Sequence, residues 1–228
     1  MKFAIFLTLT ALAVETLAVK YQCSFTNRKV WFADATFYDC DVTSGSIETI
    51  RQKCVESVSG NHLSGYDDQQ ITSLGISRAT TIYMPRGLEN YFPELVSIDI
   101  YKVGLSEVHQ EDLKPYKELK FVSFAENKLR HLEENLFMHN PKLEVILLYR
   151  NQIKSVGAVF KNLNNLRSMN FDGNECSSGS ENGKYQVGNL IRSIYENCEF
   201  RYEQALEYCV TELTSYKTQF DMYCEGKF

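Results

Sequence analysis

Several residue types and patterns are scarce or absent in this chain. Only 4 of its 228 residues are proline and one is tryptophan, and no cysteine occurs from residue 55 to residue 175. The chain contains no Asn-x-Ser/Thr acceptor, so no N-linked glycan is expected to cover its surface. Beyond the first residues no apolar run is long enough to cross a bilayer, and stable membrane insertion is therefore not expected.

The chain also lacks the signatures of nucleic-acid binding and of catalysis. Its 24 basic and 29 acidic residues are interspersed, and no basic stripe interleaves with aromatic residues, so a nucleic-acid partner is not expected. It has no G-x-S-x-G, Walker-type or H-E-x-x-H motif. The histidines are not spaced with Cys, Asp or Glu as metal ligands would be. No catalytic residue, metal or cofactor is therefore predicted, and acidic pairs such as Glu133–Glu134 are interpreted as solvated surface.

The chain does contain a repeat of about 24 residues. Each copy opens on an apolar residue, at Ile71, Leu95, Leu119, Leu143 and Leu166. The copies share the pattern L-x-x-L-x-L-x-x-N-x-L, which is clearest in the third copy, LKFVSFAENKL. A fixed period of roughly 20–29 residues with this pattern predicts a leucine-rich repeat solenoid. The expected fold is an α/β solenoid with a curved parallel β-sheet of about five repeats over residues 71–174.

The register of the repeat predicts which side chains face inward. Side chains alternate along a strand, so the fourth and sixth positions share one face, and all ten are apolar. They are Leu74, Ile98, Val122, Ile146, Met169, Ile76, Ile100, Phe124, Leu148 and Phe171. The ninth position holds Asn127, Asn151 and Asn174, whose amides can both donate to and accept from buried turn backbone. Ala79 and Val103 occupy that position in the first two repeats, where we expect differently satisfied turns.

The outward strand positions predict a binding surface on the concave face. The residues expected to contribute most to binding are Tyr101, Phe121, Val145, Leu147, Tyr149 and Arg150. A contiguous group of exposed aromatic residues and arginine is typical of protein interfaces. The alternatives are scattered surface residues, or coverage of the face by a terminal segment.

The amino terminus has the pattern of a signal peptide over residues 1–18. A basic Lys2 precedes an apolar run from Phe3 to Val14, and Ala18 closes a segment suitable for cleavage. This pattern predicts an extracellular, secreted protein; the alternative is a short membrane anchor. The seven cysteines flank the repeats, which fits an oxidising compartment.

The cysteines indicate a cap at each end of the solenoid, as open repeat arrays require. Residues 19–70 are expected to form an N-terminal cap with a β-hairpin closed by Cys23 and Cys40. Residues 175–200 are expected to form a C-terminal cap closed by Cys176 and Cys198. Cys54 has no evident local partner, and its pairing stays open together with that of Cys209 and Cys224.

Residues 201–228 are expected to form an amphipathic C-terminal helix. Apolar residues from Tyr202 to Tyr223 follow a heptad spacing, and Cys209 lies among them. Two interpretations remain open. The 202–223 helix and Cys209 could join two copies in a homodimer, or the helix could fold back on the cap.

Several segments resemble the secreted leucine-rich repeat proteins that are abundant in insects. They are Y-x-C-x-F (residues 21–25), YDCDV (38–42), SGNH (59–62), MPRGLENYFPEL (84–95), DLKPYKEL (112–119), NLFMHNPKLE (135–144) and F-D-G-N-x-C (171–176). The resemblance covers nearly the whole mature chain. It implies an extracellular interaction module, and some such relatives act in innate immunity. Some of those carry a C-terminal coiled coil with cysteines that join chains, whereas this chain has a short helical tail.

These features predict a secreted, non-enzymatic binding protein. It would recognise an extracellular protein or glycoconjugate on the concave face of the solenoid. The alternative is a structural or assembly protein that forms multimers through its C-terminal helix.

Overall fold

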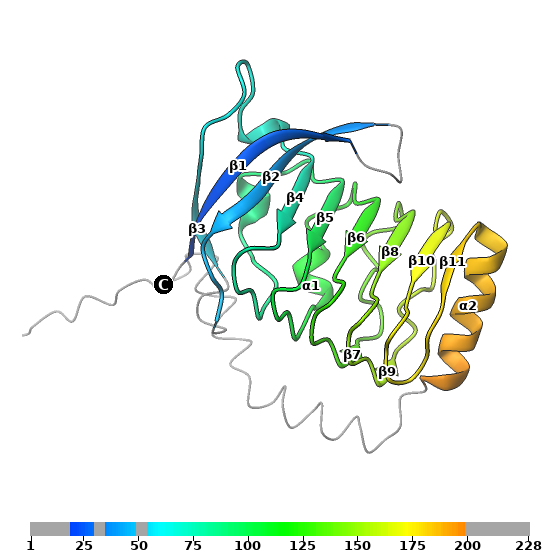
Figure 1. Ribbon diagram of the computed structural model, residues 1–228. Coiled ribbons are helices and arrows are strands. Elements are labelled where there is room, and N and C mark those ends of the chain that lie inside the picture. The colour runs from blue at the N-terminus through cyan, green and yellow to red at the C-terminus, as the bar shows by residue number, and fades with distance from the viewer. Residues whose placement is uncertain (1–18, 30–34, 49–53, 199–228) are drawn as a thin grey trace, which may run out of the picture.

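The computed structural model describes residues 19–29, 35–48 and 54–198 (Figure 1). The predicted signal peptide and the predicted C-terminal helix with Cys209 and Cys224 lie outside the described residues, so the homodimer through residues 202–223 stays a prediction. Within the described part of the chain, no helix is long and apolar enough to cross a membrane.

A curved, mostly parallel sheet forms one side of the molecule (Figure 1). One strand of each repeat contributes to it, and these strands are β4 (Ser73–Ile76), β5 (Ser97–Ile100), β6 (Phe121–Ser123), β8 (Val145–Leu147) and β10 (Ser168–Asn170). Neighbours pair in parallel with equivalent positions opposite one another, so that Ser97 faces Phe121 and Phe121 faces Val145. The leucine-rich repeat fold and its register are therefore as predicted.

The inside of the solenoid is filled as the repeat pattern predicts. All ten side chains at the fourth and sixth positions are buried. Aromatic residues from the return segments, including Phe92, Tyr116 and Phe137, complete this core from the opposite side. The return segments contain short elements: η2 (Asp68–Gln70), η3 (Leu88–Asn90), α1 (Gln110–Leu113), β7 (His131–Leu132) and β9 (Ser155–Val156). Burial of these columns holds each repeat against the next.

The N-terminal cap extends the same sheet. Its strands are β1 (Val19–Lys29), β2 (Thr36–Ser44) and β3 (Val55–Ser59). β1 pairs antiparallel with β2 and parallel with β3, and β2 pairs in parallel with β4 of the first repeat. The disulfide Cys23–Cys40 joins the two long strands, as predicted. The sheet therefore runs without a break from the cap into the repeats.

The C-terminal cap closes the other end. β11 (Ser180–Asn182) pairs antiparallel with β10, and α2 (Lys184–Asn197) follows it. α2 buries Val187, Leu190 and Ile194, which lie on one helix face, and the predicted Cys176–Cys198 disulfide fixes its end. Cys54, in the N-terminal cap, is also disulfide-bonded.

The asparagine at the ninth position supports the turn of its own repeat and of the preceding repeat. The Asn127 Oδ1 atom accepts from the backbone N–H groups of Val103 and Leu105 at 3.1 and 3.0 Å. Its Nδ2 atom donates to the carbonyl groups of Ile100 and Phe124 at 2.7 and 3.0 Å. Asn127 thus satisfies the turn of the second repeat, which has a valine at this position.

The ladder continues through the later repeats and ends before the first. Asn151 and Asn174 repeat the arrangement one and two repeats further on. In the first repeat the Thr81 N–H instead donates to the Val103 carbonyl at 3.0 Å, and the Ile76 carbonyl accepts from the Tyr101 N–H at 2.9 Å. The turn there is satisfied by backbone groups, in agreement with the expectation of a differently satisfied turn.

Candidate functional site

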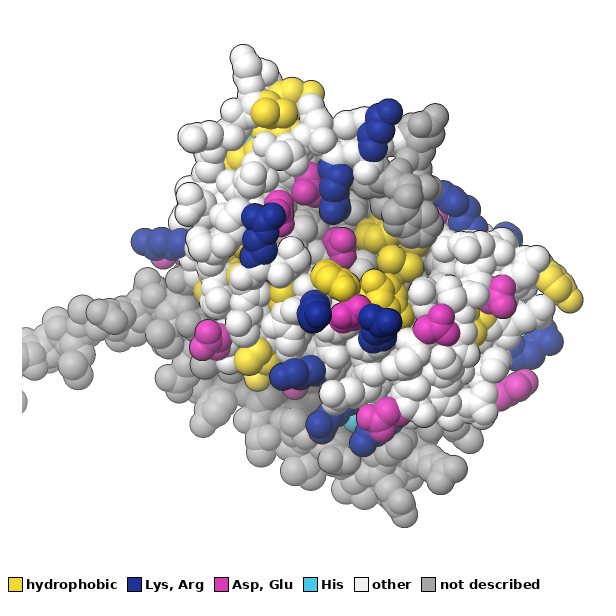
Figure 2. All heavy atoms as spheres, in the orientation of Figure 1, with side chains coloured by type: hydrophobic (Ala, Val, Ile, Leu, Met, Phe, Trp, Pro, Cys, Tyr) yellow, Lys and Arg dark blue, Asp and Glu magenta, His cyan; other side chains and the backbone are white. Residues whose placement is uncertain are grey.

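The candidate binding surface lies on the concave side of the sheet, and it has two halves that differ in exposure. Tyr101 and Tyr149 are half-buried and Arg150 is exposed. We call these residues, with Lys102 and Glu126 beside them, the open half. In Figure 2, hydrophobic side chains gather in the middle of this face with basic and acidic side chains next to them.

A network of polar contacts joins the open half across three repeats. The Glu126 carboxylate accepts from the Arg150 Nη1 atom at 2.8 Å and lies 3.8 Å from the Lys102 Nζ atom. The Tyr101 hydroxyl donates to the same carboxylate. Arg150 and Lys102 keep most of their side-chain surface exposed, at 71% and 69%. Two exposed cations with unused donors therefore contact Glu126, and each directly follows one of the two tyrosines in the chain.

The backbone of the turns brings these three charged side chains to one edge. Lys102, Glu126 and Arg150 occupy the eighth position of successive repeats, and each has a left-handed backbone with φ of 53–55°. Residues other than glycine rarely adopt this conformation, and the surrounding structure must hold it. Glu126 and Arg150 are each followed by an asparagine, and the Nδ2 atoms of Asn127 and Asn151 donate to the carbonyl groups of Ala125 and Tyr149 at 3.1 and 3.4 Å. The asparagine ladder thus supports the edge of the open half.

The charges of the open half shift the pKa values of its members. The hydrogen bonds from Arg150 and Tyr101 lower the pKa of Glu126. The bond to Glu126 raises the pKa of Tyr101. Burial, with Glu126 and Asp99 nearby, raises the pKa of Tyr149. At neutral pH the open half therefore presents an ionised carboxylate held between cations and two neutral phenols.

Two of the residues predicted to lie on the binding surface are not exposed. Phe121 and Val145 are only 4% and 0% exposed, and they form one buried apolar cluster with Phe37 of β2. Val96 and the half-buried Leu147 border this cluster. The prediction that Phe121 and Val145 are accessible was wrong, because Phe37 of the β1–β2 hairpin packs in the same buried cluster. We call Phe121, Val145, Leu147 and the covering Phe37 the covered half.

A polar cluster lies beside the covered half, beneath the same hairpin. The Arg28 Nη2 atom lies 3.5 Å from Asp39 Oδ1 and donates to the Ser73 hydroxyl at 3.2 Å. The Arg28 Nη1 atom lies 4.0 Å from Asp99 Oδ2. Burial raises the pKa of both carboxyl groups, although Arg28 and hydrogen bonds from Ser73 and Ser123 oppose the shift. The hairpin therefore contacts the repeats through ionic as well as apolar side chains.

The pattern of the third position contains a signal for this coverage. Three repeats have serine there (Ser73, Ser97 and Ser168), and two have the large apolar residues Phe121 and Val145. Large apolar residues confined to two neighbouring repeats indicate that something covers those strands. The residues that sequence reasoning missed, Arg28, Phe37 and Asp39, belong to the segment that does so.

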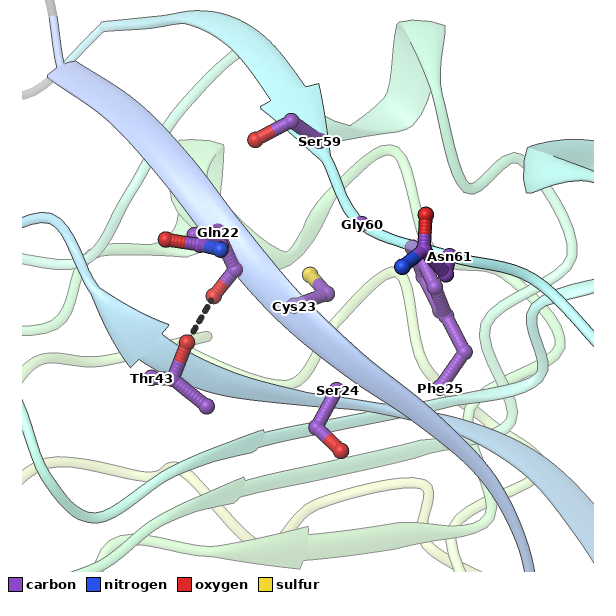
Figure 3. A pocket seen from close by; sticks show the side chains of 8 residues that line it. All are labelled: Gln22, Cys23, Ser24, Phe25, Thr43, Ser59, Gly60 and Asn61. Carbon is purple, nitrogen blue, oxygen red and sulfur yellow. Dashed lines mark hydrogen bonds between the residues drawn. The ribbon is translucent and has the colours of Figure 1, made fainter.

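A separate hollow of about 480 Å³ lies in the N-terminal cap, between β1 and residues 59–61 at the end of β3 (Figure 3). It is lined by Gln22, Cys23, Ser24, Phe25, Thr43, Ser59, Gly60 and Asn61. Gly60 has φ of +154°, and a side chain there would collide with the carbonyl oxygen of Cys23. No carboxylate, imidazole or amine lines the hollow, so its lining offers hydrogen bonding without acid–base chemistry.

The histidines are engaged in the framework of the fold. His62 stacks on Phe25 and bonds the Tyr38 hydroxyl at 3.0 Å and Asp68 at 3.1 Å. His109 lies 3.2 Å from a carboxylate oxygen of Glu133. In residues 19–29, 35–48 and 54–198, no group of three or more His, Cys, Asp or Glu side chains is placed to hold a metal ion.

A protein-family profile described as "Leucine rich repeat" matches residues 117–175. The chain contains a leucine-rich repeat domain. The matched residues include β6, β8 and β10 and the three asparagines of the ladder.

Three solved structures show similarity to parts of the chain. The Toll–Spätzle complex from Drosophila matches at 16% identity over 55% of this chain, with a TM-score of 0.44. An internalin from Listeria monocytogenes matches at 15% identity over 60%, with a TM-score of 0.40. A TLR13–ssRNA13 complex matches at 13% identity over 47%, with a TM-score of 0.34. The matched regions span 17%, 42% and 22% of those chains, respectively.

Proposed function

We propose that this chain is a secreted, non-enzymatic binding protein whose concave face holds an extracellular protein partner. The observation that carries the proposal is the open half, in which two tyrosine rings lie beside exposed Arg150 and Lys102. Tyrosine and arginine supply large contact area and several donors, and they are the residues most often dominant in protein interfaces. A glycoconjugate is the other class of partner that these groups could bind.

Secretion is supported by the disulfides and by the signal-like pattern of residues 1–18. Cys23–Cys40 and Cys176–Cys198 fasten the two caps, and such bonds persist in oxidising compartments. Innate defence is the biological setting favoured by the resemblance to secreted insect leucine-rich repeat proteins.

Partner capture by a triple variant tests the proposal. The proteins that co-purify with the exported chain are identified first, and capture is then compared between the natural chain and a Tyr101→Ala, Tyr149→Ala, Arg150→Ala variant. We expect the variant to lose capture with little change in melting temperature, because all three side chains are at least partly exposed. A matched Met138→Ala, Tyr185→Ala variant removes two exposed side chains outside the concave sheet and should retain capture. Undiminished capture by the folded triple variant would refute the proposal.

A further inference from the structure

The covered half carries an inference that rests on the proposed function. Phe121 and Val145 point to the concave side of β6 and β8, in the same strands that lead to the open half. They are buried by another part of the molecule, because Phe37 of the hairpin joins them in one buried apolar cluster. Phe37 therefore shows that a large apolar side chain fits beside Phe121 and Val145.

The end of the hairpin that carries Phe37 is held to the repeats differently from its base. The backbone ladder between β2 and β4 runs from Asp39 to Val42, and Tyr38 adds a bond to Thr72. Beyond Tyr38, Phe37 and Arg28 contact the repeats through their side chains. Another molecule can therefore replace the side-chain contacts of Phe37 and Arg28 while the backbone hydrogen bonds between β2 and β4 stay intact.

Coverage also leaves polar atoms poorly satisfied. The Arg28 Nε and Ser97 Oγ atoms are buried and lack a hydrogen-bond partner, and the buried Asp39 Oδ1 atom has only the 3.5 Å ionic contact with Arg28 Nη2. Ser97 lies between Ser73, which contacts Arg28, and Phe121, which contacts Phe37, in the paired register of the sheet. Buried polar atoms without partners oppose the arrangement that buries them. The free energy gained by burying Phe37 is thus partly offset by the cost of burying these polar atoms without hydrogen bonds.

We propose that the binding surface continues beneath the hairpin, and that a large apolar side chain of the protein partner replaces Phe37 against Phe121 and Val145. The partner gains the burial that Phe37 has in the free protein. Displacement of Phe37 and Arg28 returns the Arg28 side chain to water and uncovers the carboxylate of Asp39, which stays paired with β4. The partner thus presents an aromatic or large aliphatic residue next to the groups that contact Tyr101, Tyr149 and Arg150.

A small aromatic probe tests this inference without the partner. N-acetyl-L-phenylalanine amide is titrated into the full chain and into Phe37→Ala and Phe37→Leu variants, with the methyl NMR signals of Val145 as the readout. We expect Phe37→Ala to bind the probe with a Kd at least about tenfold lower than that of the natural chain, because the place beside Phe121 is vacated. Phe37→Leu, which keeps a large apolar side chain there, should bind as weakly as the natural chain.

The natural chain is the second part of the test. Its Val145 methyl signals should shift in the same direction as those of Phe37→Ala, at higher probe concentration, because the probe must displace Phe37. The inference is overturned if these signals stay fixed in the natural chain at a hundredfold excess over the Kd of the variant, or if Phe37→Ala shows no gain. If Phe37→Ala does not fold, as judged by the side-chain amide signals of Asn127 and Asn151, Phe37→Val takes its place in the titration. A failure here would leave the triple-alanine capture experiment unaffected, so the two proposals can fail separately.

Discussion

The open half and the covered half of the concave face are built on the same strands and differ in what lies over them. Tyr101 and Tyr149, at the seventh position of the repeat, remain accessible, whereas Phe121 and Val145, at the third, are sealed by Phe37. The repeat determines on which face a side chain lies. Its exposure on that face depends on the cap, because the hairpin of the cap reaches over two strands of the repeats.

The open half and the polar cluster beside the covered half also differ in electrostatics. In the open half Glu126 is contacted by two exposed cations, which favours its ionised form. In the polar cluster under the hairpin, Asp39 and Asp99 share Arg28, and burial disfavours their ionised forms. A charge on the concave face is thus stabilised where water and cations reach it and destabilised beneath the hairpin.

Introducing a carboxylate into each half should give the largest difference in unfolding free energy. We expect Val145→Asp to lower the free energy of unfolding by about 4 kcal/mol, because an unpaired carboxylate would be buried against Phe37 and Phe121. Tyr149→Asp, in the open half, should cost about 1 kcal/mol or less. Urea unfolding of both variants measures the difference, and equal losses would show that the halves are not distinct.

Substitution of the asparagines that support the open half should give the next largest change in unfolding free energy. Asn127→Ala removes an amide that bonds the turns of two repeats, and we expect a loss of about 2–3 kcal/mol in unfolding free energy. Asn174→Ala, at the more exposed end of the ladder and with fewer bonds, should cost less. Thermal unfolding compares the two variants. A cost for Asn174→Ala equal to or above that for Asn127→Ala would contradict the role given to burial in the ladder.

Two serines under the hairpin should respond in opposite directions. Ser73→Ala removes the acceptor of the Arg28 bond and should destabilise the fold by about 1 kcal/mol. Ser97→Ala removes a buried hydroxyl without a partner and should raise stability by up to about 1 kcal/mol. Both substitutions occur at the third position of neighbouring repeats, so each controls for the other in urea unfolding. A clear loss of stability in Ser97→Ala would show that its hydroxyl is satisfied.

The pKa values of Glu126 in the open half and of Asp99 in the polar cluster under the hairpin should be shifted in opposite directions from their ordinary values. The raised pKa of Asp99 means that the folded state binds its proton more tightly, so its contribution to stability is present in acid and is lost as pH rises through the folded pKa. The lowered pKa of Glu126 gives a contribution that is present above its unfolded pKa and is lost as pH falls through the folded pKa. Carboxyl carbon NMR titration measures both. Shifts in the same direction would contradict the electrostatic comparison.

Most of the framework follows from sequence periodicity, and the covered half does not. The 24-residue spacing determines which columns are buried, and the asparagine register places Asn127, Asn151 and Asn174 on one line of turns. The large apolar side chains of Phe121 and Val145 indicate that their strands are covered. Their own repeats do not identify the covering segment, because the packing of Phe37 against them is a tertiary contact. The left-handed backbone conformation at Lys102, Glu126 and Arg150 was also not predicted, because a charged residue in the sequence does not indicate a positive φ.

Site-specific photo-crosslinking tests the central claim most directly. A photoreactive phenylalanine analogue replaces either Tyr149, in the open half, or Met138, which is exposed on the return segment between β7 and β8. Both chains are illuminated with the co-purifying partner. We expect a covalent adduct from position 149 and none from position 138. An adduct at position 138, with none at position 149, would show that the partner binds outside the concave face and would contradict the proposed function.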